Sequence, residues 1–374
     1  MVHVMVVVAA VSAFVSQEPR IPIDSAWTLS GEGTRIEDYR GVKALRMRTG
    51  GAVRRDLTLQ DGTIEFDMAV TPHRSFIYVL FRMQDDDNHE EIYFRPHKTS
   101  LPDAIQYAPV WSGESNWQLY HGKRGTAPVA LPRDEWIHVR LVLSGQRAAL
   151  FVGDSAAPHL VMRLARASAP GYVAFRSFVP AGGAPDGVTA ATFANVVVRP
   201  GHVAYDFAAT PSDSLPSGLV TRWQISPPFA ARGAVTRLPD SLLASRARWT
   251  SIPVEPTGVA VIGRHVKRPA PQAATIARLV LRASAAGLQR MQLGYSDYVT
   301  VFVNGRPLFA GDAHYSFDEP RQDGVIGLHQ SMVWLPLVRG ENEILLAVTD
   351  GFGGWGLTAR LEPTPGVSVV PPAR

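Results

Sequence analysis

The sequence predicts an all-β protein built from two β-sandwich domains. Apolar and polar residues alternate with a period of two in many short segments, which is the pattern of half-buried strands. Gly, Pro, Asp and Asn recur between these segments, as they do in sandwiches and barrels. With 374 residues, 46% of them hydrophobic, the chain exceeds the usual size of one domain and can bury a core in each of two.

The first domain is expected over residues 22–200. Segment 63–70 alternates, so that Ile64 and Phe66 face the core while Glu65 and Asp67 face away. The strands expected in this domain cover residues 63–70, 75–82, 91–97, 136–143 and 191–200.

The second domain is expected over residues 201–365, and residues 366–374 are expected to form a tail. Asn304 and Gly305 predict a tight hairpin turn. The Gly-rich segment 351–356 has no following helix or Lys, so it is interpreted as a turn that lets Trp355 pack rather than as a phosphate loop. The strands expected here cover residues 275–284, 299–312, 332–338, 343–350 and 355–362.

Composition excludes several classes of function. Cysteine is absent, which removes disulfides, thiol catalysis and cysteine-bound metals. The formal net charge is only +4 and no basic run appears, so we expect no nucleic-acid partner.

The first 16 residues, MVHVMVVVAAVSAFVS, form an apolar run too short to span a bilayer. Small residues near its end match a cleavage site, so we interpret it as an export signal removed after about Ala13 or Ser16. The mature protein is then expected to be periplasmic or extracellular, without a membrane span. A buried N-terminal strand is the alternative.

Polar and aromatic residues alternate in EIYFRPH, residues 91–97. As a strand, this segment places Glu91, Tyr93, Arg95 and His97 on one face. Carboxylates, amides and guanidinium groups bind sugar hydroxyls, and aromatic rings stack on sugar rings. We therefore predict a saccharide-binding face. The polar residues expected to share this face are Glu65, Asp67, Gln118, Tyr120, His138 and Arg140.

An ordinary solvated face, with cross-strand ion pairs such as Glu91 with Arg140, is the alternative interpretation. Segment 97–122 is long for a connection and rich in binding side chains, and it is expected to wall one end of the cleft. Its candidate binding residues are Asp103, Gln106, Tyr107 and Trp111, with Tyr107 or Trp111 as the stacking platform. A covering loop with aromatic anchors would explain them as well.

The blocks DGTIEFDMAV, FIYVLFRMQDDDNHEEIYFRPH and DEWIHVRLVLSGQRAALFV resemble laminin-G/concanavalin A-like sandwich domains. Within that superfamily they are most similar to the bacterial group of 3-keto-disaccharide hydrolases, over about residues 25–200. The blocks VTVFVNGRPLF, LPLVRGENEILLAV and GGWGLTARLE resemble galactose-binding-like jelly rolls. The second resemblance transfers no binding residue.

The resemblance implies glycoside hydrolysis of the 3-keto-disaccharide type, with Glu91 and His97 as the acid and base candidates. A pair of carboxyl groups, Glu91 with Glu65, Asp67 or Asp103, is an alternative for hydrolysis. A lyase is another, in which His97 and Tyr93 serve proton abstraction and Arg95 neutralises a uronate carboxylate. A non-catalytic glycan-binding or adhesion protein, or a structural module of an extracellular assembly, would use the same fold.

The acidic run at residues 85–88 raises the question of a metal. Asp85, Asp86, Asp87 and Asn88 could chelate a structural Ca²⁺ through oxygen, but a polar hairpin turn explains them too. Histidines are scattered without zinc-site spacing, so no metal-binding residue is assigned.

Overall fold

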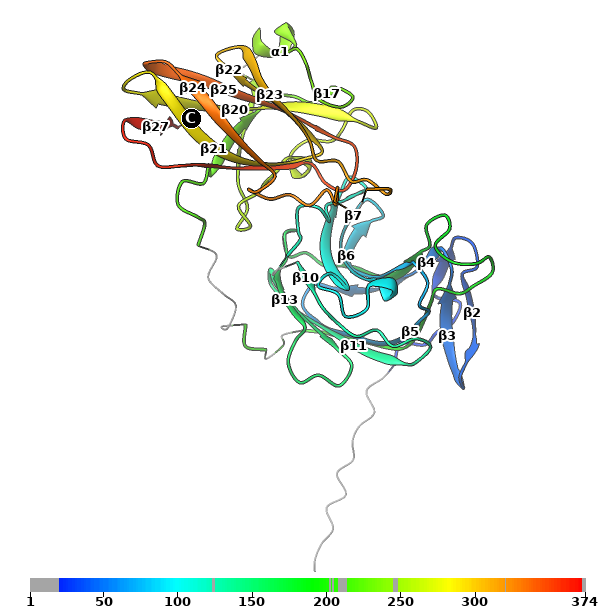
Figure 1. Ribbon diagram of the computed structural model, residues 1–374. Helices are drawn as coiled ribbons and strands as arrows, with labels where there is room; N and C mark the ends of the chain where they lie inside the picture. Colours follow the sequence, from blue (N-terminus) through cyan, green and yellow to red (C-terminus); the bar gives the residue numbers. More distant parts are fainter. Residues whose placement is uncertain are drawn as a thin grey trace, which may run out of the picture.

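The computed structural model describes residues 20–122, 125–201, 203, 205–207, 214–244, 248–319 and 321–371. The predicted export signal, residues 1–16, lies outside the described residues. Two stacked lobes form the molecule, the first containing the blue to green elements and the second the light green to red ones (Figure 1). Helices in the described part are short, such as α1 (Asp240–Ala244), η1 (Pro96–Lys98) and η3 (Ile262–Arg264). None of them is long and apolar enough to cross a membrane.

The first lobe is a sandwich of two antiparallel sheets. Sheet 1 contains, in spatial order, β1 (Thr28–Ser30), β4 (Gly50–Leu59), β14 (Gly171–Phe178), β6 (Phe76–Asp85), β7 (Asn88–Phe94), β8 (Ile105–Trp111) and β10 (Thr126–Ala127), with β9 (Glu114–Ser115) paired to β8. Sheet 2 contains β13 (Leu160–Arg163), β12 (Arg147–Val152), β11 (Ile137–Ser144), β5 (Gly62–Val70), β15 (Ala191–Pro200), β3 (Val42–Met47) and β2 (Arg35–Tyr39).

The core of this sandwich follows the predicted alternation. Ile64 and Phe66 are fully buried, while Glu65 and Asp67 on the same strand point outward. Phe175 of sheet 1 lies between rings of sheet 2, with centroids 4.9 Å from Phe66 and 4.5 Å from Phe193. These contacts join the inner faces of the two sheets, as in other sandwiches.

The second lobe also contains two sheets. Sheet 3 contains β18 (Thr250–Pro253), β16 (Arg222–Ile225), β20 (Ala273–Ala283), β25 (Gly340–Asp350), β22 (Tyr298–Val303) and β23 (Arg306–Asp312), with β17 (Phe229–Ala230) and β27 (Val367–Val370) paired to β20. Sheet 4 contains β19 (Ala260–Val261), β26 (Gly356–Leu361), β21 (Gly287–Ser296) and β24 (Ser331–Leu337). The predicted all-β fold of two sandwiches is confirmed.

Local predictions in the second lobe have mixed outcomes. Asn304 and Gly305 form the β22–β23 turn with φ angles of 49° and 80°, as a tight hairpin requires. Trp355 is fully buried, and its indole N–H donates to the Val348 carbonyl oxygen at 3.1 Å. The expected C-terminal tail is instead partly a strand, because β27 pairs with the free side of β20 near Ala283.

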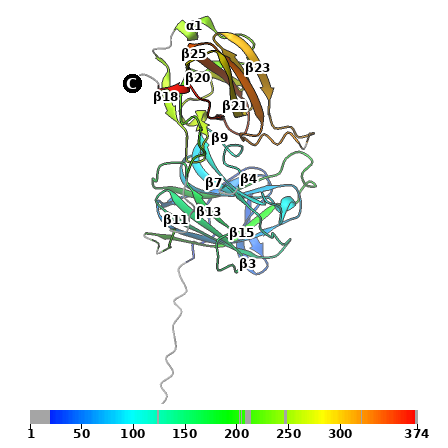
Figure 2. The same cartoon turned by 60° about the vertical axis from the view of Figure 1, so that its left-hand side comes forward.

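The two lobes are joined through the segment after β8. In Figure 2, β9 lies at their junction. Gln118 is fully buried there, where its backbone N–H donates to the Gly353 carbonyl oxygen at 3.0 Å and its side chain accepts a hydrogen bond from the Ser296 hydroxyl. Tyr120 donates to Glu255 of the second lobe at 2.5 Å. These contacts hold the two lobes docked against each other.

One acidic side chain lies inside the first sandwich. Glu90 on β7 is fully buried, where it accepts hydrogen bonds from the Tyr107 hydroxyl at 2.6 Å and the Arg166 backbone N–H at 3.1 Å. Burial raises the pKa of Glu90 from 4.5 to about 7, and the two hydrogen bonds oppose this shift. Between pH 4.5 and about 7, Glu90 is therefore protonated in the folded protein but ionised in the unfolded chain.

We predict that Glu90→Gln flattens the pH dependence of stability. In the wild type, the contribution of Glu90 to the free energy of unfolding falls as pH rises from about 4.5 to about 7 and is level above that window. Glutamine has no proton to lose, so the variant should decline less over the same range. Urea denaturation at several pH values measures this, and parallel curves for the two proteins would contradict it.

Candidate functional site

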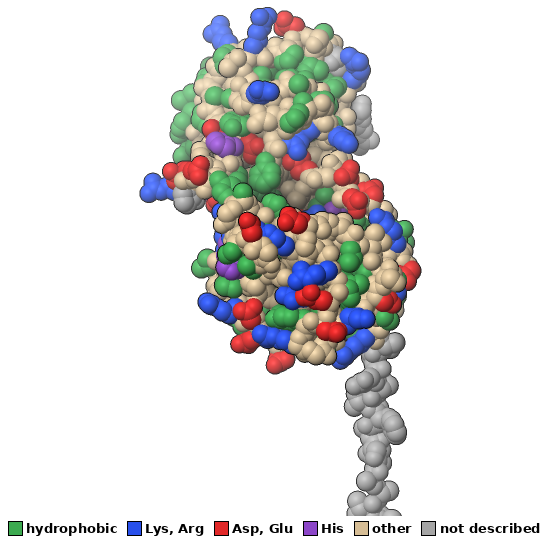
Figure 3. All heavy atoms as spheres, turned by 90° about the vertical axis from the view of Figure 1, so that its right-hand side faces the viewer, with side chains coloured by type: hydrophobic (Ala, Val, Ile, Leu, Met, Phe, Trp, Pro, Cys, Tyr) green, Lys and Arg blue, Asp and Glu red, His purple; other side chains and the backbone are tan. Residues whose placement is uncertain are grey.

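A cleft of about 700 Å³ lies between the outer face of sheet 1 and the loops of the second lobe. Figure 3 shows the surface hollowed where the two lobes meet, with hydrophobic side chains exposed beside the hollow. Both lobes contribute to its lining, so the cleft exists only because they are docked. Concave sites at domain junctions are common places for ligands.

Aromatic rings are the main apolar feature of the cleft. Phe178, Phe317 and Phe352 line it and are 45%, 58% and 57% exposed, which is unusual for phenylalanine. Trp117 also lines the cleft, and its ring lies 5.4 Å from Tyr315 and 6.1 Å from Phe352. The cleft therefore offers open ring faces supplied by both lobes.

A hydrogen-bonded group on sheet 1 forms the polar part of the cleft. Tyr93 donates to the side-chain oxygen of Gln106 at 2.7 Å, and Arg95 donates to the same oxygen at 3.2 Å. Asp103 binds both Arg95, at 3.0 Å, and Lys98, at 2.5 Å. Gln106 itself is fully buried and is not among the lining residues, so it holds Tyr93 and Arg95 in place rather than facing the cleft.

His97 lines the cleft from η1, beyond the end of β7. Its ring packs edge-on against Phe76 with centroids 5.6 Å apart. Burial, together with the positive charges of Arg74, Arg95 and Lys98, lowers the pKa of His97 to about 4. The imidazole is therefore neutral near pH 7 and can donate or accept a hydrogen bond.

Glu91 lies on the same outer face of sheet 1 as Tyr93, but it does not reach the cleft. Its carboxylate is fully buried, 2.6 Å from an Arg176 nitrogen, and it accepts a hydrogen bond from Ser115 at 2.6 Å. Burial would raise the pKa of Glu91, but Arg176 and the neighbouring His89 outweigh it and hold the pKa below its usual value. The predicted pairing of Glu91 and His97 around a substrate is therefore not present.

The prediction that polar residues of three strands share one face is wrong. Asp67 and His138 belong to β5 and β11 of sheet 2, on the opposite side of the sandwich, where their side chains pair at 2.9 Å. Arg140 packs over the ring of Phe151 at 3.8 Å, so the alternative pair of Glu91 with Arg140 does not form either. A two-residue period separates inward from outward side chains but does not say which sheet a strand joins.

The segment after η1 also departs from expectation. Tyr107 points into the core, where its hydroxyl binds Glu90, and it cannot stack on a ligand. Trp111 is half-buried beside Tyr120, outside the lining of the cleft. Residues 116–120 form turns rather than a strand, so Trp117 faces the cleft, while Gln118 and Tyr120 are buried against the second lobe.

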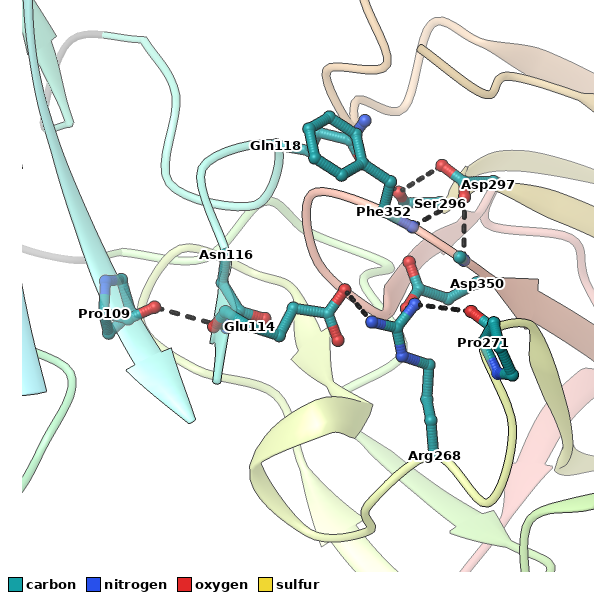
Figure 4. A network of polar contacts seen from close by, with 11 residues as sticks. Pro109, Glu114, Asn116, Gln118, Arg268, Pro271, Ser296, Asp297, Asp350 and Phe352 are labelled. Carbon is teal, nitrogen blue, oxygen red and sulfur yellow. Dashed lines mark hydrogen bonds and ion pairs between the residues drawn. The ribbon is translucent and has the colours of Figure 1, made fainter. Parts of the chain in front are cut away.

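A charged network closes the inner end of the junction (Figure 4). Arg268 of the second lobe lies 3.2 Å from Glu114 of the first lobe and 3.2 Å from Asp350. Burial raises the pKa of Glu114, against the opposing charge of Arg268. Burial and the charges of Glu114 and Asp297 raise the pKa of Asp350 well above its usual value. Glu114 and Arg268 also line the cleft. The raised pKa means that the Glu114 carboxyl group keeps its proton to higher pH than an ordinary one.

Several lining residues were not identified from the sequence. Arg74 lies in the connection between β5 and β6, Phe178 is the last residue of β14, and Glu114 begins the two-residue strand β9, all without a recognisable motif. Tyr315 and Phe317 lie in a long loop, and loop length could have singled them out as it did segment 97–122. Segment 351–356, interpreted only as a turn, also carries Phe352 into the cleft.

The acidic run at residues 85–88 forms the β6–β7 turn. The side chain of Asp85 accepts hydrogen bonds from the Asp87 backbone N–H and the Asn88 side chain, both at 2.9 Å. Within the part of the chain that the structure describes, no three His, Asp or Glu side chains are grouped as metal ligands.

No protein-family model and no curated protein sequence matches this chain. Among solved structures, the carbohydrate binding module CBM66 from Bacillus subtilis aligns at 15% identity with a TM-score of 0.36, over 48% of this chain and 98% of its own. Bacillus licheniformis beta-glucanase aligns at 12% identity and a TM-score of 0.36, over 50% and 97%. A family 35 carbohydrate binding module from an environmental isolate aligns at 18% identity and a TM-score of 0.19, over 25% and 69%. These similarities concern the fold alone.

Proposed function

We propose that this protein binds a saccharide in the cleft between its two lobes. The observation that carries the proposal is the convergence of exposed aromatic rings, Phe352 and Phe317 among them, with hydrogen-bonding groups in one cleft. Sugar rings present C–H faces that pack on aromatic rings and hydroxyls that bind charged and amide groups. The cleft volume of about 700 Å³ is in the range of small-ligand sites.

Each lobe has a distinct part in this proposal. Tyr93, Arg95 and Asp103 of the first lobe bind hydroxyl groups. Gln106 holds Tyr93 and Arg95 in place, and Arg95 in turn holds Asp103. Phe352 and Trp117 supply the stacking surface. Binding then requires the docked arrangement of both lobes, which distinguishes this site from a lectin site on one sandwich alone.

The proposal predicts that Phe352→Ala weakens saccharide binding by about fivefold, because loss of a stacking ring removes on the order of 1 kcal/mol. A glycan array identifies the ligand, and titration calorimetry then compares the variants. Trp334→Ala is the matched control, because Trp334 is 53% exposed on β24 and does not line the cleft. Equal affinity in wild type and Phe352→Ala, or a loss of affinity in Trp334→Ala alone, would show that the saccharide binds outside this cleft.

Glycoside cleavage of the 3-keto-disaccharide type is a second candidate function. One observation favours it over binding alone, namely that Glu114 lines the cleft with a raised pKa. A carboxyl group with a raised pKa keeps its proton to higher pH and can protonate the oxygen of a leaving sugar. Product analysis on 3-keto and ordinary disaccharides separates the two candidates, because a binding protein releases its ligand unchanged.

A further inference from the structure

We propose that the saccharide carries an oxyanion, a carboxylate or a sulfate, and that the guanidinium group of Arg74 binds it. This inference rests on the proposed function and narrows its ligand class. It depends on the charge balance of the cleft and on how Arg74 is held there. Guanidinium groups suit both oxyanions because their N–H donors form a planar fork.

The other basic side chains on the same wall of the cleft are paired with acids. Arg95 and Lys98 both bind Asp103, so one carboxylate serves two cations. At the junction, Arg268 lies between two carboxyl groups. The remaining lining carboxylate, Asp323, accepts a hydrogen bond from the Val325 backbone N–H at 3.0 Å.

Arg74 differs from these groups. Among the residues that the structure describes, no carboxylate lies within ion-pair distance of its guanidinium, and its buried Nε has no hydrogen-bond partner. Its backbone N–H donates to the Gly183 carbonyl oxygen at 2.9 Å. Its guanidinium packs over the Phe317 ring at 4.0 Å and donates to the Tyr315 hydroxyl at 3.4 Å. Arg74 is thus a cation held in the cleft by the other lobe and left without an acid.

The imidazole of His97 lies in the positive potential of the same side chains. After burial, the positive charges of Arg74, Arg95 and Lys98 make the next contributions that lower its pKa. Its buried Nδ1 also has no hydrogen-bond partner among the described residues. An oxyanion bound at Arg74 would offset this positive charge and therefore raise the pKa of His97.

The test compares binding of a uronate-containing oligosaccharide, its carboxyl-reduced neutral counterpart and a sulfated counterpart. Wild type is expected to prefer at least one anionic form by about tenfold or more at low salt, and the preference should shrink as salt rises. Arg74→Gln should abolish the preference, and Arg74→Lys should keep part of it. Arg140→Gln is the control, because Arg140 packs over Phe151 as Arg74 packs over Phe317 but on the opposite side of the sandwich.

An NMR titration of His97 supplies a second readout. The pKa of His97 should rise when the preferred anionic saccharide is bound to wild type, but not when the neutral counterpart is bound. Equal binding of neutral and anionic forms by wild type, or a preference unchanged in Arg74→Gln, would overturn the inference while leaving saccharide binding intact. Binding of none of the three, together with no ligand on a broad glycan array, would instead overturn the proposed function.

Discussion

Replacing Glu91 by alanine is expected to destabilise the first sandwich by about 1–3 kcal/mol, because the variant loses hydrogen bonds made by a buried carboxylate while its partner Arg176 stays partly exposed to solvent. The carboxylate is fully buried and binds Arg176 and Ser115, each at 2.6 Å. Alanine leaves Arg176 without its partner and opens a polar cavity on sheet 1. Chemical denaturation of wild type and variant measures the loss.

The conservative variant Glu91→Gln separates a structural role from a catalytic one. Glutamine can still accept the hydrogen bond from Ser115 but removes the charge that Arg176 binds, so an intermediate loss of stability is expected. Saccharide binding by the folded fraction should persist in both variants. If Glu91→Gln were fully stable but had lost all activity on a saccharide, Glu91 would have the catalytic role predicted from the sequence.

Under the second candidate function, glycoside cleavage, Glu114→Gln is expected to lower turnover by about 10²–10⁴-fold, the usual contribution of a positioned general acid. Binding should change far less, because the amide keeps the shape and the hydrogen-bonding capacity of the side chain. The raised pKa of Glu114 also predicts that turnover declines when pH rises far enough to remove its proton. Initial rates on the cleaved disaccharide, with calorimetric affinities for the same variants, test this.

Glu255→Gln is the matched control for that experiment. Glu255 is another carboxyl group at the junction of the lobes with a pKa raised by burial, and it binds Tyr120 and Arg264, but it does not line the cleft. If both variants lose turnover equally, the effect comes from the contact between the lobes rather than from proton donation. If Glu114→Gln retains full turnover, Glu114 is not the acid.

Strand positions could be predicted from the sequence because burial imposes a period that a single strand displays. The segments around Ile64 and Val139 alternate as expected, and β15 begins at residue 191 and ends at residue 200 as predicted. The hairpin at Asn304 and Gly305 followed from the positive φ angles that such turns require.

The site could be predicted only in part, because it depends on how distant segments meet. Tyr93, Arg95, His97 and Asp103 do line the cleft, since their pattern is local to one strand and the residues that follow it. No local pattern assigns β5 and β7 to different sheets, so the sequence alone cannot separate Asp67 from Glu91. Phe352 comes from the other lobe, and its exposure follows from docking of the lobes rather than from its neighbours in the sequence.

The most direct test of the central claim is a crystal structure of the protein with the oligosaccharide that it binds most tightly. We predict that a sugar ring lies between sheet 1 and the second lobe, against Phe352 and within hydrogen-bonding reach of Tyr93 or Arg95. Density for the sugar on the outer face of sheet 2 near His138, or on β24 at Trp334, with the cleft left to solvent, would contradict the claim.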